Sequence, residues 1–590
     1  MDGLEGWKRT ATCGDLGRQD SGKEVILMGW VHRRRDHGGL IFVDLRDRYG
    51  ITQIVFDPQH ANDTYVRAKE LRGEYVVAVK GQVQLRPEGM INPNLSTGEI
   101  EVSVRELKIL NPAKTPPIGV AENVEVSEEL RLKYRYLDLR SPQMQKSLII
   151  RHKTYQAVRS FFDAHNFIEV ETPYLMRSTP EGARDYLVPS RIHKGKFYAL
   201  PQSPQTYKQV LMIAGLDRYY QIVRCFRDED LRADRQPEFT QIDVEMSFVE
   251  LNDVLQLNEE LMVQIFKKVL NLDIDTPFPR LTYAEAMARF GSDKPDLRFD
   301  LEITEITDCV KECEFKVFTE TVKAGGIVCG VLLKNGAGLS RKRIDTLTHS
   351  MLELGAKGLI AIKVSEDGWE SSLTKFFTPA AIQQINTAFD AKPGDLLLLI
   401  ADERNKALTL AGTLRQKLAE EEKLIPQGIY KHVWIVDFPL LEFDREENRY
   451  VARHHPFTSP LDEDLQLLEQ EPQRARAKAY DLVLNGYEIA GGSIRIHTRE
   501  LQDKIFRLLG LSKAEAEDKF GFLLNAFEFG APPHGGIAFG FDRLVMILAN
   551  KKSLREVIAF PKTNSALSLM DGAPSEVTEE QLQELNLKTV

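Results

Sequence analysis

The stretch Phe226-Arg227-Asp228-Glu229, followed by Arg235-Gln236-Pro237-Glu238-Phe239, decides the fold. It predicts a β-strand over residues 219–227, a turn, and a return strand over residues 239–248. The return strand alternates: one face carries Phe239, Gln241, Asp243 and Glu245, and the other carries Thr240, Ile242, Val244 and Met246. A purely structural strand rarely has three polar groups on one face, so this face is predicted to line a site.

A second stretch, Gly536-Ile537-Ala538-Phe539-Gly540-Phe541-Asp542-Arg543, places an arginine where a strand meets a helix. The guanidinium group holds phosphate oxygens bidentately and stays charged. The chain has neither a GxxxxGK[ST] loop nor a GxGxxG after a strand, so a bound nucleotide needs another frame. Arg227 and Arg543 are therefore the candidate phosphate ligands. Phe239 is a candidate to stack on adenine, and its alternative role is that of a core aromatic.

A third stretch, residues 481–495, supplies hard oxygen ligands. Asp481 and Glu488 are of the type that Mg²⁺ prefers when it bridges protein and phosphate. The pair Gly491-Gly492 predicts a tight bend at which the backbone approaches a ligand closely.

The bulk composition is that of a globular protein with about four domains. The 590 residues are 43% hydrophobic and 28% charged, and no apolar run reaches membrane-spanning length. The first 20 residues lack the pattern of a signal peptide, so we expect a cytoplasmic protein. Five scattered cysteines support neither a disulfide framework nor a zinc site. A net charge of −10 argues against non-specific coating of nucleic acid, but local basic runs such as Arg33-Arg34-Arg35 are compatible with a specific nucleic-acid ligand.

The chain changes character twice. Residues 1–110 read as five short strands with a helix between the third and fourth, which is the order of an OB-fold. The Pro-rich run from Asn111 to Pro117 then predicts a linker. Residues 296–425 carry no candidate catalytic residue and read as an inserted α+β domain.

Together, these motifs resemble those of the class II aminoacyl-tRNA synthetases. Residues 167–173 (FIEVETP) resemble motif 1, and the two arginine-bearing stretches resemble motifs 2 and 3. The resemblance narrows to the bacterial-type aspartyl-tRNA synthetases, a class IIb family, at residues 179–186 (TPEGARDY), 202–208 (QSPQTYK), 226–245 and 454–458 (HHPFT). It covers nearly the whole chain, apart from the first dozen residues and the tail after about Asp571.

The resemblance implies an α/β multidomain fold with an OB-fold barrel, an antiparallel-sheet catalytic domain and a GAD-like insert. The predicted boundaries are 1–112 for the anticodon-binding OB-fold, 113–135 for a hinge linker, 136–295 and 426–562 for the two parts of the catalytic domain, 296–425 for the insert, and 563–590 for a C-terminal extension.

The resemblance also implies a role for each matching residue. Aspartate would be bound by Glu181, Gln205, Lys208, Arg227, Asp243, His454 and Arg495. ATP would be bound by Arg227, Asp228, Glu229, Gln236, Phe239, Glu488, Gly540, Phe541, Asp542 and Arg543, with Arg227 and Arg543 catalytic, and Mg²⁺ would be held by Asp481 and Glu488. Two cations facing a short anionic side chain would reject an uncharged amide, which leaves them unpaired.

The OB-fold is implied to read the anticodon of tRNA(Asp). The matching residues are Arg33, Arg35, Phe42 and Gln53. Members restricted to this tRNA commonly carry a larger apolar residue at the position of His37 and no glycine at that of Gly89. The combination His37 and Gly89 is similar to that of the non-discriminating branch, which also aspartylates tRNA(Asn).

Several alternatives stay open. The chain could be a discriminating aspartyl enzyme, or a catalytically inactive paralogue that binds RNA through its OB-fold. Among relatives, a lysine pocket should carry acids in place of Lys208 and Arg495, and an asparagine enzyme typically lacks the insert. The family further implies a homodimer with the motif 1 region around Pro173 at its interface.

Overall fold

The structure is a computed structural model that describes residues 1–120, 126–178 and 183–589. Contacts divide the chain into two units, which are described separately. The first contains residues 1–152, 231–236 and 549–577, and the second contains residues 153–230, 237–548 and 578–590. Within the described ranges, no helix is both long and apolar enough to cross a lipid bilayer.

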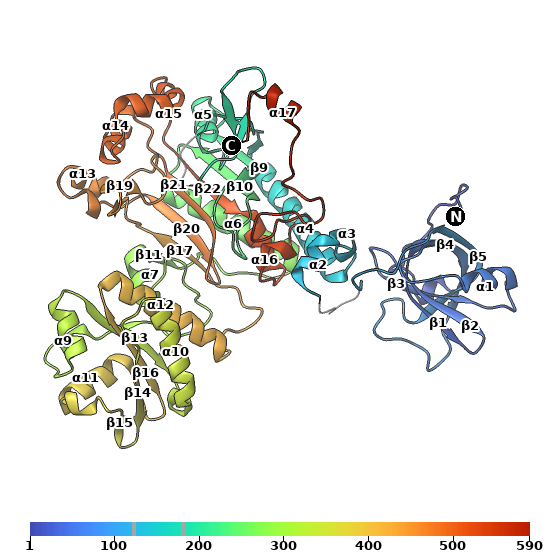
Figure 1. Ribbon diagram of the computed structural model, residues 1–590, viewed down its shortest axis with the longest axis horizontal. Coiled ribbons are helices and arrows are strands. Elements are labelled where there is room, and N and C mark those ends of the chain that lie inside the picture. The colour runs from blue at the N-terminus through green and yellow to red at the C-terminus, as the bar shows by residue number, and fades with distance from the viewer. Residues whose placement is uncertain (121–125, 179–182, 590) are drawn as a thin grey trace. The chain divides into compact units, whose positions relative to one another are not determined.

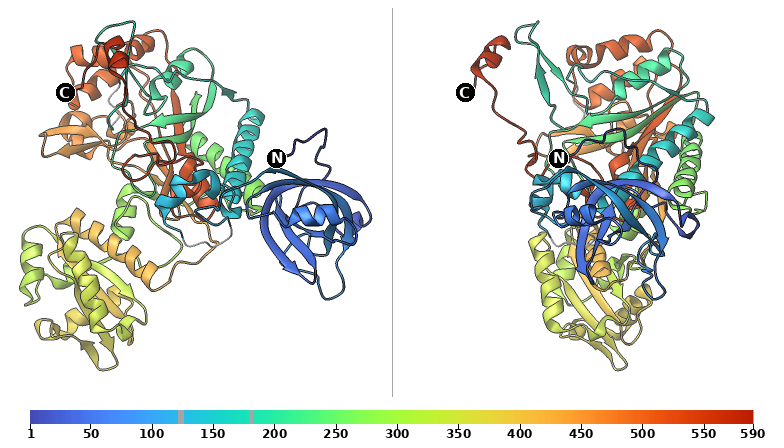
Figure 2. Two further views of the ribbon diagram at one scale, coloured as in Figure 1. Left: turned by 45° about the vertical axis from the view of Figure 1, so that its right-hand side comes forward. Right: turned by 90° about the vertical axis from the view of Figure 1, so that its right-hand side faces the viewer.

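A closed five-stranded barrel opens the first unit. Its strands run in the order β1-β2-β3-β5-β4, with bounds Glu24–His37, Leu40–Arg46, Ile51–Phe56, Ile100–Asn111 and Val76–Leu85. Helix α1 (Asn62–Ala68) follows β3, and Figure 2 shows the barrel and this helix in blue. The barrel closes because alternate residues of each strand, such as Leu27 and Val43, fill one apolar interior. The predicted OB-fold, with its helix between the third and fourth strands, is thus confirmed.

The remainder of the first unit is helical. Helices α2 (Glu128–Lys133) and α3 (Arg135–Asp138) precede the long helix α4 (Pro142–Ala164), which continues into the second unit. Arg135 is buried, and its guanidinium donates to the carbonyl oxygens of Arg555, Ile558 and Ala559. Arg135 therefore joins helix α3 to the segment 555–559, near the C-terminal end of the chain.

An eight-stranded, mainly antiparallel sheet forms the core of the second unit (Figure 1). Its order is β11-β17-β20-β21-β22-β10-β9-β6, with bounds Arg280–Thr282, His432–Val436, Ala479–Leu484, Tyr487–Ile494, His534–Gly540, Glu238–Ser247, Arg218–Phe226 and Ile168–Glu169. The principal helices of this part are α5 (Gln205–Ile213), α6 (Leu251–Leu270), α7 (Tyr283–Phe290), α14 (Arg499–Leu508), α15 (Lys513–Phe527) and α16 (Phe541–Leu548).

A second sheet of five strands lies between α7 and β17 in the chain. Its order is β12-β13-β16-β14-β15, with bounds Thr304–Glu305, Ile327–Leu333, Leu396–Asp402, Ile360–Ser365 and Gly368–Glu370. It is accompanied by α9 (Lys316–Lys323), α10 (Arg341–Glu353), α11 (Pro379–Phe389) and α12 (Arg404–Glu421). Buried side chains on both faces of β16 explain its unbroken apolar sequence.

Candidate active site

Four neighbouring strands place candidate residues in one row across the large sheet. Asp481 on β20 is opposite Gly491 on β21, Gly491 is opposite Ala538 on β22, and Ala538 is opposite Asp243 on β10. Opposed residues project to the same face, so both carboxylates share one side of the sheet. At about 4.8 Å per strand, the backbones of Asp243 and Asp481 are about 14 Å apart, with only small residues between them. This face therefore has two separate charged ends.

The first end is a compact network of buried charges. The ammonium group of Lys208, on α5, lies 2.8 Å from Asp243 Oδ1 and 3.2 Å from Glu245 Oε2. Arg495, just after β21, donates through Nε to Glu245 Oε1 at 2.9 Å and through Nη2 to Oε2 at 3.1 Å. It also donates through Nη1 to Ser493 Oγ at 2.7 Å. These four charged side chains are at most 5% exposed, so their charges attract one another through little water.

Burial and the neighbouring cations shift the pKa values of the two carboxyl groups in this network in opposite directions. Burial alone would raise the pKa of Glu245, but Arg495 and Lys208 lower it to about 2. Burial raises the pKa of Asp243 despite the neighbouring Lys208. Asp243 Oδ2 is buried and has no hydrogen-bond partner among the described residues. Because an unsatisfied carboxylate oxygen in such a place is costly, this atom is suited to accept a ligand ammonium.

Gln205 and His454 are the other described residues predicted to bind aspartate. Gln205 is buried on the first turn of α5 and donates to Gln209 at 3.1 Å. The His454 side chain is 22% exposed and packs edge-on against Phe438 at 4.5 Å between ring centroids, and its Nδ1 lies 4.0 Å from Asp481 Oδ1, so it lies beside the candidate magnesium ligands. Burial lowers its pKa to about 4, so the imidazole is neutral near pH 7. Glu181 lies outside the described residues.

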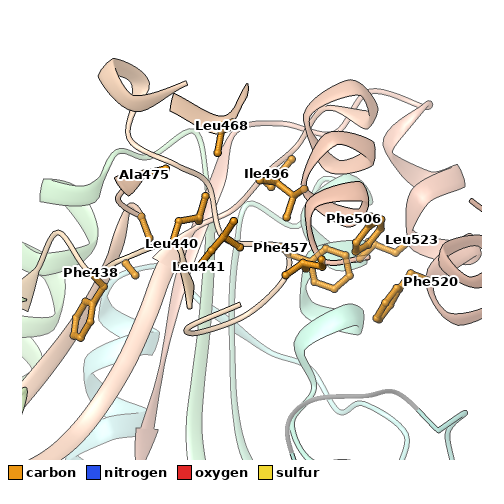
Figure 3. Close-up of a cluster of buried hydrophobic side chains, with 14 of the residues drawn as sticks. Phe438, Leu440, Leu441, Phe457, Leu468, Ala475, Ile496, Phe506, Phe520 and Leu523 are labelled. Carbon is orange, nitrogen blue, oxygen red and sulfur yellow. The ribbon is translucent and has the colours of Figure 1, made fainter. Parts of the chain in front are cut away.

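An apolar cluster anchors the loop that carries His454 (Figure 3). Phe457 is fully buried and packs edge-on against Phe520 at 5.1 Å, and Phe520 stacks on Phe506. Gln502 also donates to the carbonyl of Pro456 at 2.9 Å. The loop is therefore held by α14 and α15, which fixes where its histidines lie.

A more open part of the site contains Arg227, at the turn between β9 and β10. Strand β9 ends at Phe226, and the Arg227 N–H donates to the carbonyl of Pro237 at 2.9 Å, which closes the base of the turn. The Arg227 guanidinium lies 5.1 Å from the centre of the partly buried Phe239 ring. Its Nε is buried without a hydrogen-bond partner among the described residues. Asp228, beside it, bonds through its backbone N–H to the carbonyl of Arg184, and Glu229 is half-buried.

Arg543 lies where β22 passes into α16, as predicted. Its Nη1 donates to the carbonyl oxygen of Glu488, which ties it to β21. The preceding residues have structural contacts: Phe541 is buried and stacks on Tyr155 at 4.2 Å, and Asp542 accepts from the N–H of Thr240 at 2.7 Å. Gly540 is half-buried. Because Phe541 stacks on Tyr155 and Asp542 accepts a hydrogen bond from Thr240, these two side chains would contribute to ATP binding by holding the turn that carries Arg543.

Asp481 and Glu488 have the features expected of magnesium ligands. Asp481 is buried, and its Oδ1 has no hydrogen-bond partner among the described residues. Both carboxylates lie within 4 Å of where a Cβ on Gly491 would be, so this glycine leaves the space they share. Burial, and then Glu488, raise the pKa of Asp481, while burial would raise that of Glu488 but Lys294 lowers it. Two adjacent carboxylates with one unsatisfied oxygen fit Mg²⁺, which takes few protein ligands and completes its shell with phosphate and water.

The remaining candidates belong to the first unit. Gln236 is buried, and its side chain both accepts from and donates to the backbone of Lys562.

On the barrel, Arg35 donates to Gln53 at 3.2 Å, and β1 pairs Arg35 with Phe42 on β2, so these three lie together. Arg33 is exposed. His37 is exposed at the β1–β2 hairpin, and Gly89 is exposed in the β4–β5 connection with φ +86°, a conformation that suits glycine.

One prediction is wrong, and two residues were missed. Gly491 and Gly492 do not form a bend: they lie within strand β21, where both residues pair with β20 on one side and β22 on the other, although the β20 register shifts next to them at Ile489. Instead, the absence of a side chain at Gly491 and Gly492 leaves room for the Asp481 carboxylate and the Tyr480 ring on the neighbouring strand β20. Glu245 was placed on the polar face but given no role, although its spacing from Asp243 was a usable signal. Lys294, 2.8 Å from Glu488, had no sequence signal because the two are distant in the chain.

Comparisons with known proteins agree with this geometry. Residues 127–564 match the family described as tRNA synthetases class II (D, K and N), and residues 25–110 match the OB-fold nucleic acid binding domain. The aspartate–tRNA(Asp/Asn) ligase of Caldanaerobacter subterraneus subsp. tengcongensis is 57% identical over 99% of both chains, and that of Geotalea uraniireducens is 56% identical over the full length of both.

Solved structures share the fold at low identity. The asparaginyl-tRNA synthetase of Pyrococcus horikoshii, complexed with asparaginyl-adenylate, aligns with a TM-score of 0.60 and 20% identity over 95% of this chain and 99% of its own. That of Entamoeba histolytica gives 0.57 and 18% over 93% and 98%. A family match over most of the chain, together with relatives more than half identical along its whole length, makes this protein a member of the class II tRNA synthetases of the D, K and N group.

Proposed function

We propose that the protein is a non-discriminating aspartate–tRNA ligase, which activates L-aspartate with ATP and transfers it to the 3′ end of tRNA(Asp) and tRNA(Asn). The observation that carries this proposal is the pair of buried basic side chains Lys208 and Arg495, which form ion pairs with Asp243 and Glu245. A guanidinium and an ammonium group have more N–H donors than these contacts use, and a short carboxylate can take them. Relatives more than half identical carry the name aspartate–tRNA(Asp/Asn) ligase, which supports this specificity.

The reaction requires a carboxylate and a triphosphate to meet in line. Asp243 Oδ2 would accept the aspartate ammonium, while Arg227 would bridge the reacting carboxylate and the α-phosphate. An oxygen of that carboxylate then attacks the α-phosphorus and pyrophosphate leaves, giving aspartyl-adenylate. Arg227 would stabilise the negative charge that develops on the phosphate. Arg543, Phe239 and Glu229 would hold the rest of ATP.

Asp481 and Glu488 would hold Mg²⁺ at the polyphosphate end of this face. When bound, the ion supplies positive charge against the phosphate oxygens. Little proton transfer by the protein is needed, because the attacking carboxylate is already ionised. His454, neutral near pH 7, would help to close the pocket and not act as a base.

The proposed tRNA reading uses the barrel surface. Arg35, Phe42 and Gln53, which are neighbours on the barrel, would stack on and hydrogen-bond to unpaired bases. His37 and Gly89 would leave a small polar lip that tolerates either third anticodon base, while a larger apolar residue would favour one of them.

We also propose that the protein works as a homodimer through the motif 1 region. Strand β6 is an edge strand of the large sheet, and its Ile168 is 49% exposed. Tyr174 and Leu175, further along the same region, are 45% and 52% exposed. Exposed apolar side chains next to a sheet edge favour a protein partner.

The experiment is ATP-dependent aspartate charging of two transcripts, tRNA(Asp) and tRNA(Asn). Charging of both is the expected result. Charging of tRNA(Asp) alone would keep the ligase and overturn the assignment of His37 and Gly89. Charging of neither, with no aspartate-dependent ATP–pyrophosphate exchange, would favour the RNA-binding paralogue.

A further inference from the structure

Lys294 contacts one of the two candidate metal ligands. Its ammonium nitrogen lies 2.8 Å from Glu488 Oε2, with the two side chains 42% and 32% exposed. It belongs to the irregular segment between α7 and β12, at the entrance to the inserted sheet. Among the described residues, it is the cation that forms an ion pair with Glu488.

The carboxylates beside Lys294 form an excess of negative charge. Asp481 is fully buried within the same small space as Glu488, and its Oδ1 lacks a hydrogen-bond partner among the described residues. Asp293 is a third nearby carboxylate, but Arg453 holds it at 2.9 Å. Two close carboxylates repel each other unless a cation lies between or beside them. In this structure Lys294 is the cation paired directly with Glu488, and Arg453 and Arg543 add positive charge at longer range.

The backbone of this segment is fixed, whereas the lysine side chain can leave. Arg415 donates to the carbonyl of Asp296 at 2.7 Å, and Arg298 binds the Asp296 carboxylate at 2.6 Å. The Lys294 side chain projects from this anchored segment and is nearly half exposed. A flexible, strongly hydrated ammonium group can exchange a carboxylate for water or phosphate at small cost.

We propose that Lys294 is an internal counter-cation for the Asp481–Glu488 pair, which keeps a divalent ion from binding there until ATP is present. This inference rests on the proposed magnesium site. Without ATP, Lys294 neutralises Glu488 and competes with a free divalent ion. ATP phosphates add ligands for the ion and a second anionic partner for Lys294, so the ion and the nucleotide bind together.

The test measures Mn²⁺ binding to the ATP-free protein by the loss of the electron paramagnetic resonance signal of free Mn²⁺. Lys294→Met should bind Mn²⁺ at least about tenfold more tightly than the wild-type protein, while Lys294→Arg should stay near the wild-type value. Lys267→Met is the matched control, since Lys267 forms an ion pair of the same 2.8 Å length with Asp273, on an exposed surface. It should change nothing.

Two results would overturn the inference. Equal Mn²⁺ affinity of the wild-type protein and Lys294→Met would show that the lysine does not compete. Persistence of the gain in Lys294→Met/Glu488→Gln would show that the new site is elsewhere. If Lys294→Met folds poorly, Lys294→Gln replaces it in the same assay. The measurement needs neither aspartate nor tRNA, so a protein that charges no tRNA but gains Mn²⁺ on mutation would refute the proposed function and keep the counter-cation.

Discussion

The proposed aspartate end, around Lys208 and Arg495, and the proposed phosphate end, made up of Arg227, Arg543, Asp481 and Glu488, balance their charges in opposite ways. At the first, Lys208, Asp243, Glu245 and Arg495 are buried and already satisfy most of one another's charge. At the second, Arg227 and Glu488 are only half-buried, and Glu488 is held by a partly exposed lysine. Most charges of the first end are paired before the ligand binds, with Asp243 Oδ2 left for it, whereas the second end depends on the ligand for most of its pairing.

This difference corresponds to what each end has to recognise. Selecting aspartate over asparagine depends on a difference of one charge, which is large only where water is excluded and the receiving groups are fixed. Holding a triphosphate with its metal requires many contacts, and these contacts must break again when pyrophosphate dissociates. Partly solvated arginines and carboxylates allow such exchange, because water can replace the ligand.

Breaking the buried end should give the largest effect. Arg495→Leu leaves the Glu245 carboxylate buried with one of its two cationic partners removed. Removing one member of a buried pair costs about 3–5 kcal/mol, so both stability and aspartate use should fall. We expect a loss of about 10³-fold in kcat/KM for aspartate in ATP–pyrophosphate exchange and a lower midpoint of thermal unfolding.

The control for this change is Arg289→Leu, since the Arg289–Glu302 ion pair is nearly half exposed. It should leave exchange unchanged and stability within about 0.5 kcal/mol. If Arg495→Leu were as stable as the control variant, the buried network would not be holding this part of the fold.

Breaking the open end should separate activity from stability. Arg227→Ala and Arg543→Ala should each lower exchange by about 10²- to 10³-fold, because each removes a cation aimed at the phosphates. Arg227→Ala should leave the midpoint of thermal unfolding near that of the wild-type protein, since this side chain is only half-buried. Exchange retained in both variants would contradict the assignment of this end.

The sequence predicts which residues lie at strand ends better than it predicts which residues the sheet brings together. Arg227 and Arg543 lie at the predicted strand ends because turn residues and alternating polarity are local signals. The register that aligns Asp481 with Asp243 is non-local: it depends on the order of β20, β21, β22 and β10, which lie far apart in the chain. No local pattern fixes that order.

The same limit explains the wrong bend and the missed lysine. A Gly-Gly pair is typical of turns, but in β21 the glycines are required by neighbours from other strands: a Cβ on Gly491 would lie 2.7 Å from the Asp481 carboxylate. Lys294 reaches Glu488 across nearly two hundred residues of chain, so only the folded structure brings them together.

The pH dependence of stability tests whether the imidazole of His454 is shielded from water. Burial holds the folded pKa of His454 at about 4, below the unfolded value of about 6.5. The stability due to the neutral ring is therefore fully present above about pH 6.5 and is lost as the pH falls towards 4, because the unfolded chain takes up the proton first. His454→Gln should lose about 2 kcal/mol less stability than the wild-type protein between pH 7 and pH 5.

The measurement for His454 is urea unfolding at both pH values, with His349→Gln on exposed helix α10 as the control. The control should follow the wild-type protein. A His454→Gln variant with the same acid sensitivity as the wild-type protein would mean that the loop is open to water and that this part of the site resembles the phosphate end.

The smallest expected effect lies outside the catalytic unit, on the barrel. His37→Leu replaces an exposed polar side chain at the β1–β2 hairpin with an apolar one. Exchange should not change, because the aspartate and phosphate ends are untouched. The ratio of tRNA(Asp) to tRNA(Asn) charging should rise by roughly fivefold to tenfold, about 1 kcal/mol of discrimination at one base. Gln59→Leu, an exposed polar position of the same unit, is the matched control, and an equal ratio in both variants would remove His37 from tRNA selection.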